Sequence, residues 1–312
     1  MSTAAQYPTP PVPARHREAQ LAALLTVVLW ASAFVGIRYA GRGLSPGPLA
    51  LTRLVLGSAA LGVLMLVRRE PLVRRPGIAG VVVCGVMWLA AYNVLLNAAE
   101  RRVDAGTAAL LVNVAPVFIA LLAAVTLRER LTRRLLAGCA ISFAGVGLIA
   151  IATSRHGIGA SLDAALCVAA AAVYAVGVVA QKPALRHGSA LSVTWLACTI
   201  GAAVCLPFAP SLAGQLARAH AGALLWAVYL GLVPTAIGFS TWAYALARTD
   251  AGRLGSMTYL VPPISVILGW LALGETPPLL ALPGGILCIA GVAVTRLAPR
   301  RPAATMARTP RS

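Results

Sequence analysis

Charged side chains are scarce in this chain. Only 11% of its 312 residues are charged, and Asp and Glu together number 8. A soluble domain usually carries about 25% charged residues, so this chain cannot cover a surface that is mostly exposed to water. Hydrophobic residues make up 59% of the sequence instead. The shortage of charge excludes an ordinary soluble protein and predicts an integral membrane protein, with the lipid bilayer as its first partner.

The hydrophobic runs also lack the residue sets of metal sites and intramembrane enzymes. The four histidines fall in predicted loops or tails, and no two acids lie together in a hydrophobic run. The six cysteines form no pair motif with metal spacing, which favours a packing role. We therefore predict a protein that is not an enzyme and has no catalytic residue, metal or cofactor. No acid is expected at mid-membrane, so the sequence shows no carboxylate proton relay.

Basic residues are numerous but dispersed. The net charge is +18, yet the arginines occur singly or in pairs between hydrophobic runs and do not form one face of a domain. This distribution excludes a nucleic-acid partner and is typical of membrane-protein loops. A single lysine against 25 arginines, with abundant alanine, indicates a bacterium with a GC-rich genome.

The hydrophobic runs predict ten transmembrane helices, because a helix needs about 20 mostly apolar residues to cross a bilayer. The expected helices span residues 20–40, 46–67, 77–98, 104–126, 135–153, 160–180, 190–209, 221–245, 251–273 and 279–297. The fold class is therefore an all-α integral membrane protein.

The loops predict the orientation, since cytoplasmic loops are enriched in Lys and Arg. With a cytoplasmic N-terminus, most basic residues fall on the inner side. The outer loops then hold only Arg42, Arg101, Arg102, Arg155 and Arg218. We expect a multi-pass protein of the bacterial inner (plasma) membrane, with both termini in the cytoplasm.

The sequence repeats itself at an offset of 146 residues. The triplet that starts at Asp104 recurs at Asp250, and Pro116 matches Pro262. Further matches are Leu127 with Leu273, Glu129 with Glu275, Gly138 with Gly284 and Gly145 with Gly291; at an offset of 144, Trp30 matches Tyr174 and Arg38 matches Lys182. The unit contains five helices, so the second copy must insert upside down. The loop after the first copy's fourth helix is rich in arginine and its counterpart has none, which agrees with inversion. Inverted repeats of this kind build alternating-access carriers.

Four segments follow from these patterns. We expect a disordered cytoplasmic N-tail over 1–19 and a basic disordered C-tail over 298–312. Between them we expect a first five-helix repeat over 20–153 and a second, inverted one over 160–297.

Several short motifs resemble the EamA-type members of the drug/metabolite transporter superfamily. They are the stretch Trp30 to Phe34, the stretch that ends at Pro116, the Leu-x-Glu-x-Leu pattern around Glu129, and the second-half segments Tyr259 to Pro263 and Leu273 to Glu275. The first-half pattern has Arg128 where such proteins often have glycine. The resemblance covers about residues 20–297. It implies a ten-helix carrier of amino acids, sugars, nucleotide-type metabolites or toxic organic molecules, often an exporter.

Prolines inside two predicted helices are candidates for helix breaks. Pro116, and the pair Pro262 and Pro263, fall at matched positions near mid-membrane. A proline removes a backbone donor and leaves a carbonyl without its usual partner. That carbonyl needs a partner from protein or from a water-lined cavity. A broken helix beside the substrate path is one interpretation, and a tolerated kink is the other.

Polar and aromatic residues at depth are candidates for substrate binding. We single out Trp30, Ser32, Arg53, Asn93, Asn113, Tyr174, Trp242 and Tyr259. Each uncharged one could instead join helices by hydrogen bonds. Arg53 is a charge about seven residues into its helix, so it either contacts an anionic substrate group, snorkels, or pairs with an acid such as Glu100. Trp88 is expected at an interface or facing lipid.

The remaining charges near helix ends are assigned structural roles. Asp104 fits a helix N-cap. Glu275 lies at a helix C-terminus, where the dipole disfavours it, so we expect a basic or donor partner. Arg38 is expected to snorkel.

We predict a transporter of small metabolites, amino acids or related compounds, that works as an exporter by alternating access. A multidrug carrier, a sugar or nucleoside carrier, and a membrane scaffold without transport activity are the alternatives. Small residues in the fifth and tenth helices either pack the two repeats together or form a homodimer surface.

Overall fold

The computed structural model describes residues 13–126, 133–154, 158–248, 254, 257–279 and 281–296, and all its secondary structure is helical. The first half contains α1 (Pro13–Ala40), α2 (Pro46–Arg68), α3 (Arg75–Val83), the π-helical segment η1 (Cys84–Ala91), α4 (Tyr92–Ala99), α5 (Ala105–Val112), α6 (Ala115–Thr126) and α7 (Arg133–Ser154). The second half contains α8 (Ile158–Ala184), α9 (Ala190–Val204), the 3₁₀ turn η2 (Leu206–Phe208), α10 (Ala209–Leu216), α11 (Ala221–Leu230), the π-helical segment η3 (Gly231–Ile237), α12 (Gly238–Arg248), the 3₁₀ turn η4 (Thr258–Leu260), α14 (Val261–Leu273) and α15 (Ala281–Arg296). The predicted C-tail, Glu129 and Asp250 lie outside the described residues.

Five helices of the described chain are long and apolar enough to cross a membrane. They cover Arg17–Ala40, Pro46–Arg68, Arg75–Ala99, Leu162–Ala184 and Ala221–Arg248. The pair α9 and η2–α10 would make a sixth, and it bends by 48°. Shorter apolar helices cover Ala105–Ile119, Val261–Leu273 and Ala281–Gly291. The predicted all-helical membrane fold is confirmed, whereas the count of ten spans stays a prediction.

Two predicted helices are interrupted in the structure. The helix expected over 190–209 ends at Val204, because Pro207 in η2 cannot donate the backbone hydrogen bond that would continue it. The helix expected over 104–126 breaks between α5 and α6, two residues before Pro116. This break between α5 and α6 lies beside a cavity, which Asn113 and Pro116 line.

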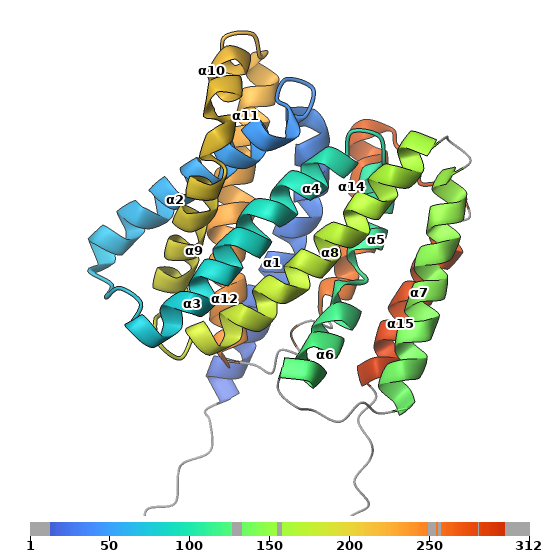
Figure 1. Cartoon of the computed structure of the whole chain (residues 1–312), viewed down its shortest axis with the longest axis horizontal. Helices are drawn as coiled ribbons and strands as arrows, with labels where there is room; N and C mark the ends of the chain where they lie inside the picture. The colour runs from blue at the N-terminus through green and yellow to red at the C-terminus, as the bar shows by residue number, and fades with distance from the viewer. Residues whose placement is uncertain are drawn as a thin grey trace, which may run out of the picture.

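The connections between the helices lie at two opposite ends of the bundle (Figure 1). The end that we call the acidic end carries the acids Glu100, Asp104, Asp163 and Glu275, near the ends of α4, α5, α8 and α14, and some of them pair with arginines there. The opposite end, which we call the basic end, carries the α2–α3 and α8–α9 connections, which are joined by a hydrogen bond from the Arg74 N–H to the His187 carbonyl (2.9 Å). The described chain begins and ends at this basic end (Figure 1).

The small residues of α7 and α15 pack these two helices against each other within the chain (Figure 1). A Cβ atom added to Gly145 would lie 2.5 Å from the Gly284 carbonyl oxygen, and one added to Gly291 would lie 2.5 Å from the Gly138 carbonyl oxygen. Ser142 donates to the Cys288 carbonyl (3.2 Å), and Cys288 donates back to the Ser142 carbonyl (3.4 Å). These contacts are reciprocal between residues 146 apart.

A methyl group at Gly145 should therefore destabilise the fold. We expect Gly145→Ala to cost about 1–3 kcal/mol, the usual penalty for overpacking, because backbone atoms of α15 would have to move. Gly147→Ala is the matched control, since nothing lies within 4 Å of a Cβ atom added there. Thermal unfolding of the purified variants in detergent measures the difference. Equal midpoints for the two variants would contradict the close approach.

Candidate substrate cavity

Both matched prolines follow a local break in the α-helical hydrogen-bond pattern. Asn113, between α5 and α6, has φ −70° and ψ 2°, and the 3₁₀ turn η4 precedes Pro262 at the equivalent place. Asn113 and Val114 match positions 259 and 260 at the repeat offset. Neither proline can donate the hydrogen bond that would continue a regular helix through these turns. The matched interruptions fit the broken-helix interpretation of the prolines.

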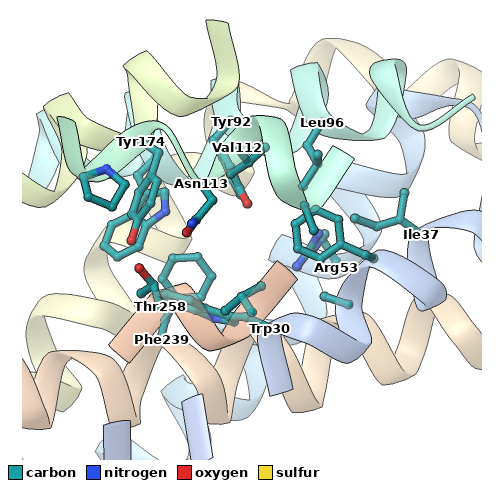
Figure 2. A pocket seen from close by; sticks show the side chains of 16 residues that line it. Trp30, Ile37, Arg53, Tyr92, Leu96, Val112, Asn113, Tyr174, Phe239 and Thr258 are labelled. Atoms are coloured by element: carbon teal, nitrogen blue, oxygen red, sulfur yellow. The ribbon is translucent and has the colours of Figure 1, made fainter. Parts of the chain in front are cut away.

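A partly open cavity lies between the two breaks (Figure 2). It is narrow, with a volume of about 60 Å³, and its lining is largely apolar. The lining residues are Trp30, Ala33, Phe34, Ile37, Arg53, Trp88, Tyr92, Leu96, Ala109, Val112, Asn113, Pro116, Tyr174, Phe239, Thr258 and Val261. They come from both halves of the chain, so the cavity is a shared space at the centre of the bundle.

Arg53 brings the single charge to this lining. It lies in α2, its side chain is 3% exposed, and its Nε donates to the Thr235 hydroxyl in η3 (3.2 Å). No described carboxylate lies within ion-pair distance of it, and the expected alternative partner Glu100 forms no such pair. A buried charge is costly unless it is paired. The guanidinium is therefore a ready partner for an anion.

An aromatic cluster forms the opposite part of the wall. The ring of Trp30 lies 5.8 Å from that of Trp88 and 5.4 Å from that of Phe239, and Tyr174 lies 4.9 Å from Trp88. Such edge-on and tilted pairs are favourable because the positive edge of one ring meets the negative face of another. This cluster gives the cavity rigid apolar surfaces.

Two polar groups of the lining point into the space. The amide of Asn113 and the hydroxyl of Tyr92 are directed into the cavity (Figure 2). The Asn113 Nδ2 has no hydrogen-bond partner among the described residues. A buried donor without a partner costs about 1–3 kcal/mol, so a polar group of a ligand would stabilise this site.

The structure brings five of the predicted site residues to one cavity, namely Trp30, Arg53, Asn113, Pro116 and Tyr174. The other predicted residues lie elsewhere or outside the description.

Three predicted binding residues lie away from the cavity. Ser32 faces a separate groove and shares a hydrogen bond with the Tyr229 hydroxyl (2.6 Å). Asn93 donates to the Leu89 carbonyl of its own helix (2.5 Å). Trp242 packs behind Trp30, with ring centres 5.0 Å apart. All three lie on helices next to the cavity, but their side chains are on faces of those helices that do not line it.

The remaining predicted positions belong to the second break. Pro262 is buried in the first turn of α14, and Pro263 is exposed on it. The side chain of Tyr259 lies outside the described residues.

The sequence interpretation missed several lining residues, above all Trp88. It was assigned to an interface or to lipid, which is wrong, because it is 2% exposed at the centre of the aromatic cluster. Trp88 lies in η1, and π-helical segments change which residues face inward. Tyr92, a polar residue one turn after Trp88 that lines the same cavity, could have indicated that this part of the helix faces inward.

An ion pair joins helices at the acidic end of the bundle, next to the lining residue Ile37. Arg38 of α1 donates to Glu275, which follows α14, with Nε 2.7 Å from Oε1. The other carboxylate oxygen of Glu275 accepts from the Ala105 N–H at the start of α5 (3.2 Å). The basic partner expected for Glu275 is confirmed, and the expectation that Arg38 merely snorkels is wrong. Asp104 caps α5 as predicted, through the Thr107 N–H (2.8 Å).

A helical membrane bundle with broken helices beside a central cavity is the arrangement typical of membrane carriers. Comparison with known proteins agrees. The model of the EamA-like transporter family matches residues 18–151 and again 162–297. The chain belongs to the EamA-like transporter family and is a transporter of small metabolites.

Individual relatives span almost the whole chain. A "Probable terminal-alkyne amino-acid exporter" of Streptantibioticus cattleyicolor is 42% identical over 294 residues, covering 92% of this chain and 97% of that protein. A "Probable amino-acid metabolite efflux pump" of Salmonella typhimurium is 29% identical over 282 residues, covering 86% of this chain and 92% of that protein. A solved crystal structure with 22% identity and a TM-score of 0.62 covers 90% of this chain and shares its fold.

Proposed function

We propose that this transporter exports amino acids or closely related carboxylates, and that Arg53 binds the carboxylate of the cargo. The observation that carries the proposal is the buried guanidinium, which faces the cavity without a carboxylate partner among the described residues. Hydrogen bonds to charged groups contribute about 1.5–3 kcal/mol each, so this contact dominates recognition. Two relatives support the choice of cargo, one named a "Probable terminal-alkyne amino-acid exporter" and the other a "Probable amino-acid metabolite efflux pump".

The rest of the lining suits the other parts of an amino acid. The Asn113 Nδ2 can donate to the carboxylate of the cargo, and the Tyr92 hydroxyl can accept from its ammonium group, which also gains from the faces of nearby aromatic rings. The apolar side chain of the cargo lies against the aromatic cluster. A cationic drug is disfavoured, because the described lining residues include no acid and Arg53 repels a positive charge.

The proposed architecture is ten spans in two inverted repeats, over 20–153 and 160–297. Two successive matches to one family model support it. The reciprocal contacts of α7 with α15 support it too. So do two π-helical segments, since Gly85 in η1 and Gly231 in η3 are 146 residues apart.

A second set of contacts repeats in the same sense. A Cβ atom added to Gly57 would lie 3.1 Å from the Gly231 carbonyl oxygen, and one added to Gly201 would lie 3.1 Å from that of Gly85. The paired positions are again related by the repeat offsets. Inverted halves around a central site are suited to alternating access.

The basic end is proposed to face the cytoplasm of a bacterial cell, with both termini on that side. The arginines of the α2–α3 connection and the tails support this orientation. Homodimer formation through α7 and α15 stays a prediction. Their glycines pack within the chain, so a dimer would use outward residues such as Ile151 and Ile286.

Flux in proteoliposomes tests the function. We expect saturable counterflow and efflux of labelled neutral amino acids, compared with protein-free liposomes. Sugars, nucleosides and a cationic drug are assayed in parallel. Flux of one of those classes, without flux of any amino acid, would overturn the assignment of cargo.

A further inference from the structure

Glu100 is a buried carboxyl group at the acidic end of the cavity. It follows the span Arg75–Ala99 as the C-cap of α4, and it is 2% exposed. Neither of its carboxyl oxygens has a hydrogen-bond partner among the described residues. A carboxylate in this setting would lose its hydration without compensation, so the neutral, protonated form is the stable one.

The guanidinium of Arg38, close to Glu100, is paired with Glu275. Arg38 places its Nε and one terminal nitrogen on Glu275, and its remaining terminal nitrogen donates to the backbone carbonyl of Glu100. The Glu100 carboxyl therefore lies beside the Arg38–Glu275 pair without sharing it.

Some surroundings of Glu100 raise the pKa of its carboxyl group and others lower it. Burial raises the pKa of Glu100 well above its usual value, Arg38 and Arg53 lower it, and Glu275 and Asp104 raise it. The other titratable neighbours are Tyr92 and Cys167. The net direction is upward because burial is the largest cause.

Glu100 also lies beside the contacts that join three helices at the acidic end. The Glu100 N–H bonds to the carbonyl of Leu96, a lining residue one turn earlier, and Ile37, another lining residue, directly precedes Arg38. The Arg38–Glu275 pair and the Ala105 N–H join α1, α14 and α5 across this end. Any opening of the acidic end must separate these elements and hydrate the carboxyl group.

We propose that Glu100 is a proton-binding site that is filled when the acidic end closes and emptied when it opens. The proposal rests on the carrier function proposed above. Closing then takes up one proton from the side that the acidic end faces, and opening returns it there. The proton is held on the carboxyl oxygen of Glu100 and exchanges with water, so no other reactant is needed.

The sign of the pH effect follows from linkage. The closed state holds the proton and the open state, with a hydrated glutamate of pKa about 4.3, releases it. Raising the pH above that value therefore favours opening, by at most tenfold per pH unit for one proton, until the pH passes the raised pKa of the closed state. Acid favours closure.

The test follows opening directly and needs no cargo. A cysteine replaces Val103, which is 2% exposed at the acidic end, and reacts with a maleimide only when that end opens. A cysteine at exposed Thr276 of the same end corrects for the pH dependence of the reagent. Both reporters are measured in nanodiscs from pH 5 to 8, after subtracting the labelling of protein without a reporter.

The parent, Glu100→Gln and Glu70→Gln are compared. We expect the ratio of Val103 to Thr276 reporter rates to rise several-fold with pH in the parent and in Glu70→Gln, and to stay low and flat in Glu100→Gln, because glutamine mimics the protonated acid. A flat ratio in the parent overturns the proposal, and so does a parent-like rise in Glu100→Gln. If no amino acid is transported in the flux assay, the proposed function fails while this result stands.

Discussion

Replacing Arg53 with glutamine should reduce amino-acid flux at low cargo concentration by about 10- to 150-fold. The estimate converts the loss of one hydrogen-bonded charge contact, about 1.5–3 kcal/mol, into an affinity ratio. Glutamine keeps a donor near Thr235 but removes the charge that the cargo carboxylate requires. The apparent KM should rise more than the maximal rate falls, because binding of the cargo is what is weakened.

The matched control is Arg68→Gln, in the same helix but exposed. It should transport normally. Size-exclusion profiles and thermal midpoints of both variants must match the parent, so that lost flux reports recognition and not misfolding. Normal flux in folded Arg53→Gln would remove Arg53 from the site and leave the fold untouched.

Replacing Trp30 with alanine should destabilise the protein by about 3–5 kcal/mol and abolish transport. The loss is typical of a large aromatic side chain removed from a packed core. Trp30 contacts the rings of Trp88, Tyr174, Phe239 and Trp242, with centres 5.0 to 6.4 Å apart. Its removal would therefore leave a void in the cavity wall that the four surrounding rings cannot all move in to fill.

Trp270→Ala is the control of equal chemistry, because Trp270 is 60% exposed on α14. Its effect on stability should stay near 0.5 kcal/mol, about the usual limit for exposed positions. Chemical unfolding in mild detergent compares the two variants. Trp30→Phe should recover much of the stability, because it retains a ring in the cluster. Similar losses for Trp30→Ala and Trp270→Ala would contradict the central role of the cluster.

Some of the site was predictable because its signals are local in the chain. Arg53 stood out as a charge within a hydrophobic run, and Asn113 lies three residues before a mid-helix proline. Trp30 and Tyr174 are aromatic residues deep in hydrophobic runs, at matched positions of the repeat. Ser32 and Asn93 do not line the cavity. A residue's depth can be estimated from its place in a run, whereas the face of the helix it occupies depends on its neighbours.

The sequence by itself determined that the chain is a helical membrane protein, that basic residues gather in alternate loops, and that prolines fall at matched positions in two helices. Each of these follows from hydrophobic length, loop charge or backbone chemistry, which are properties of short segments. Only the tertiary structure decided that Trp88 faces the cavity and that Glu100 is buried without a partner. Those outcomes depend on which helices meet and on local π-helical turns, because burial and pairing are set by contacts between segments far apart in the chain.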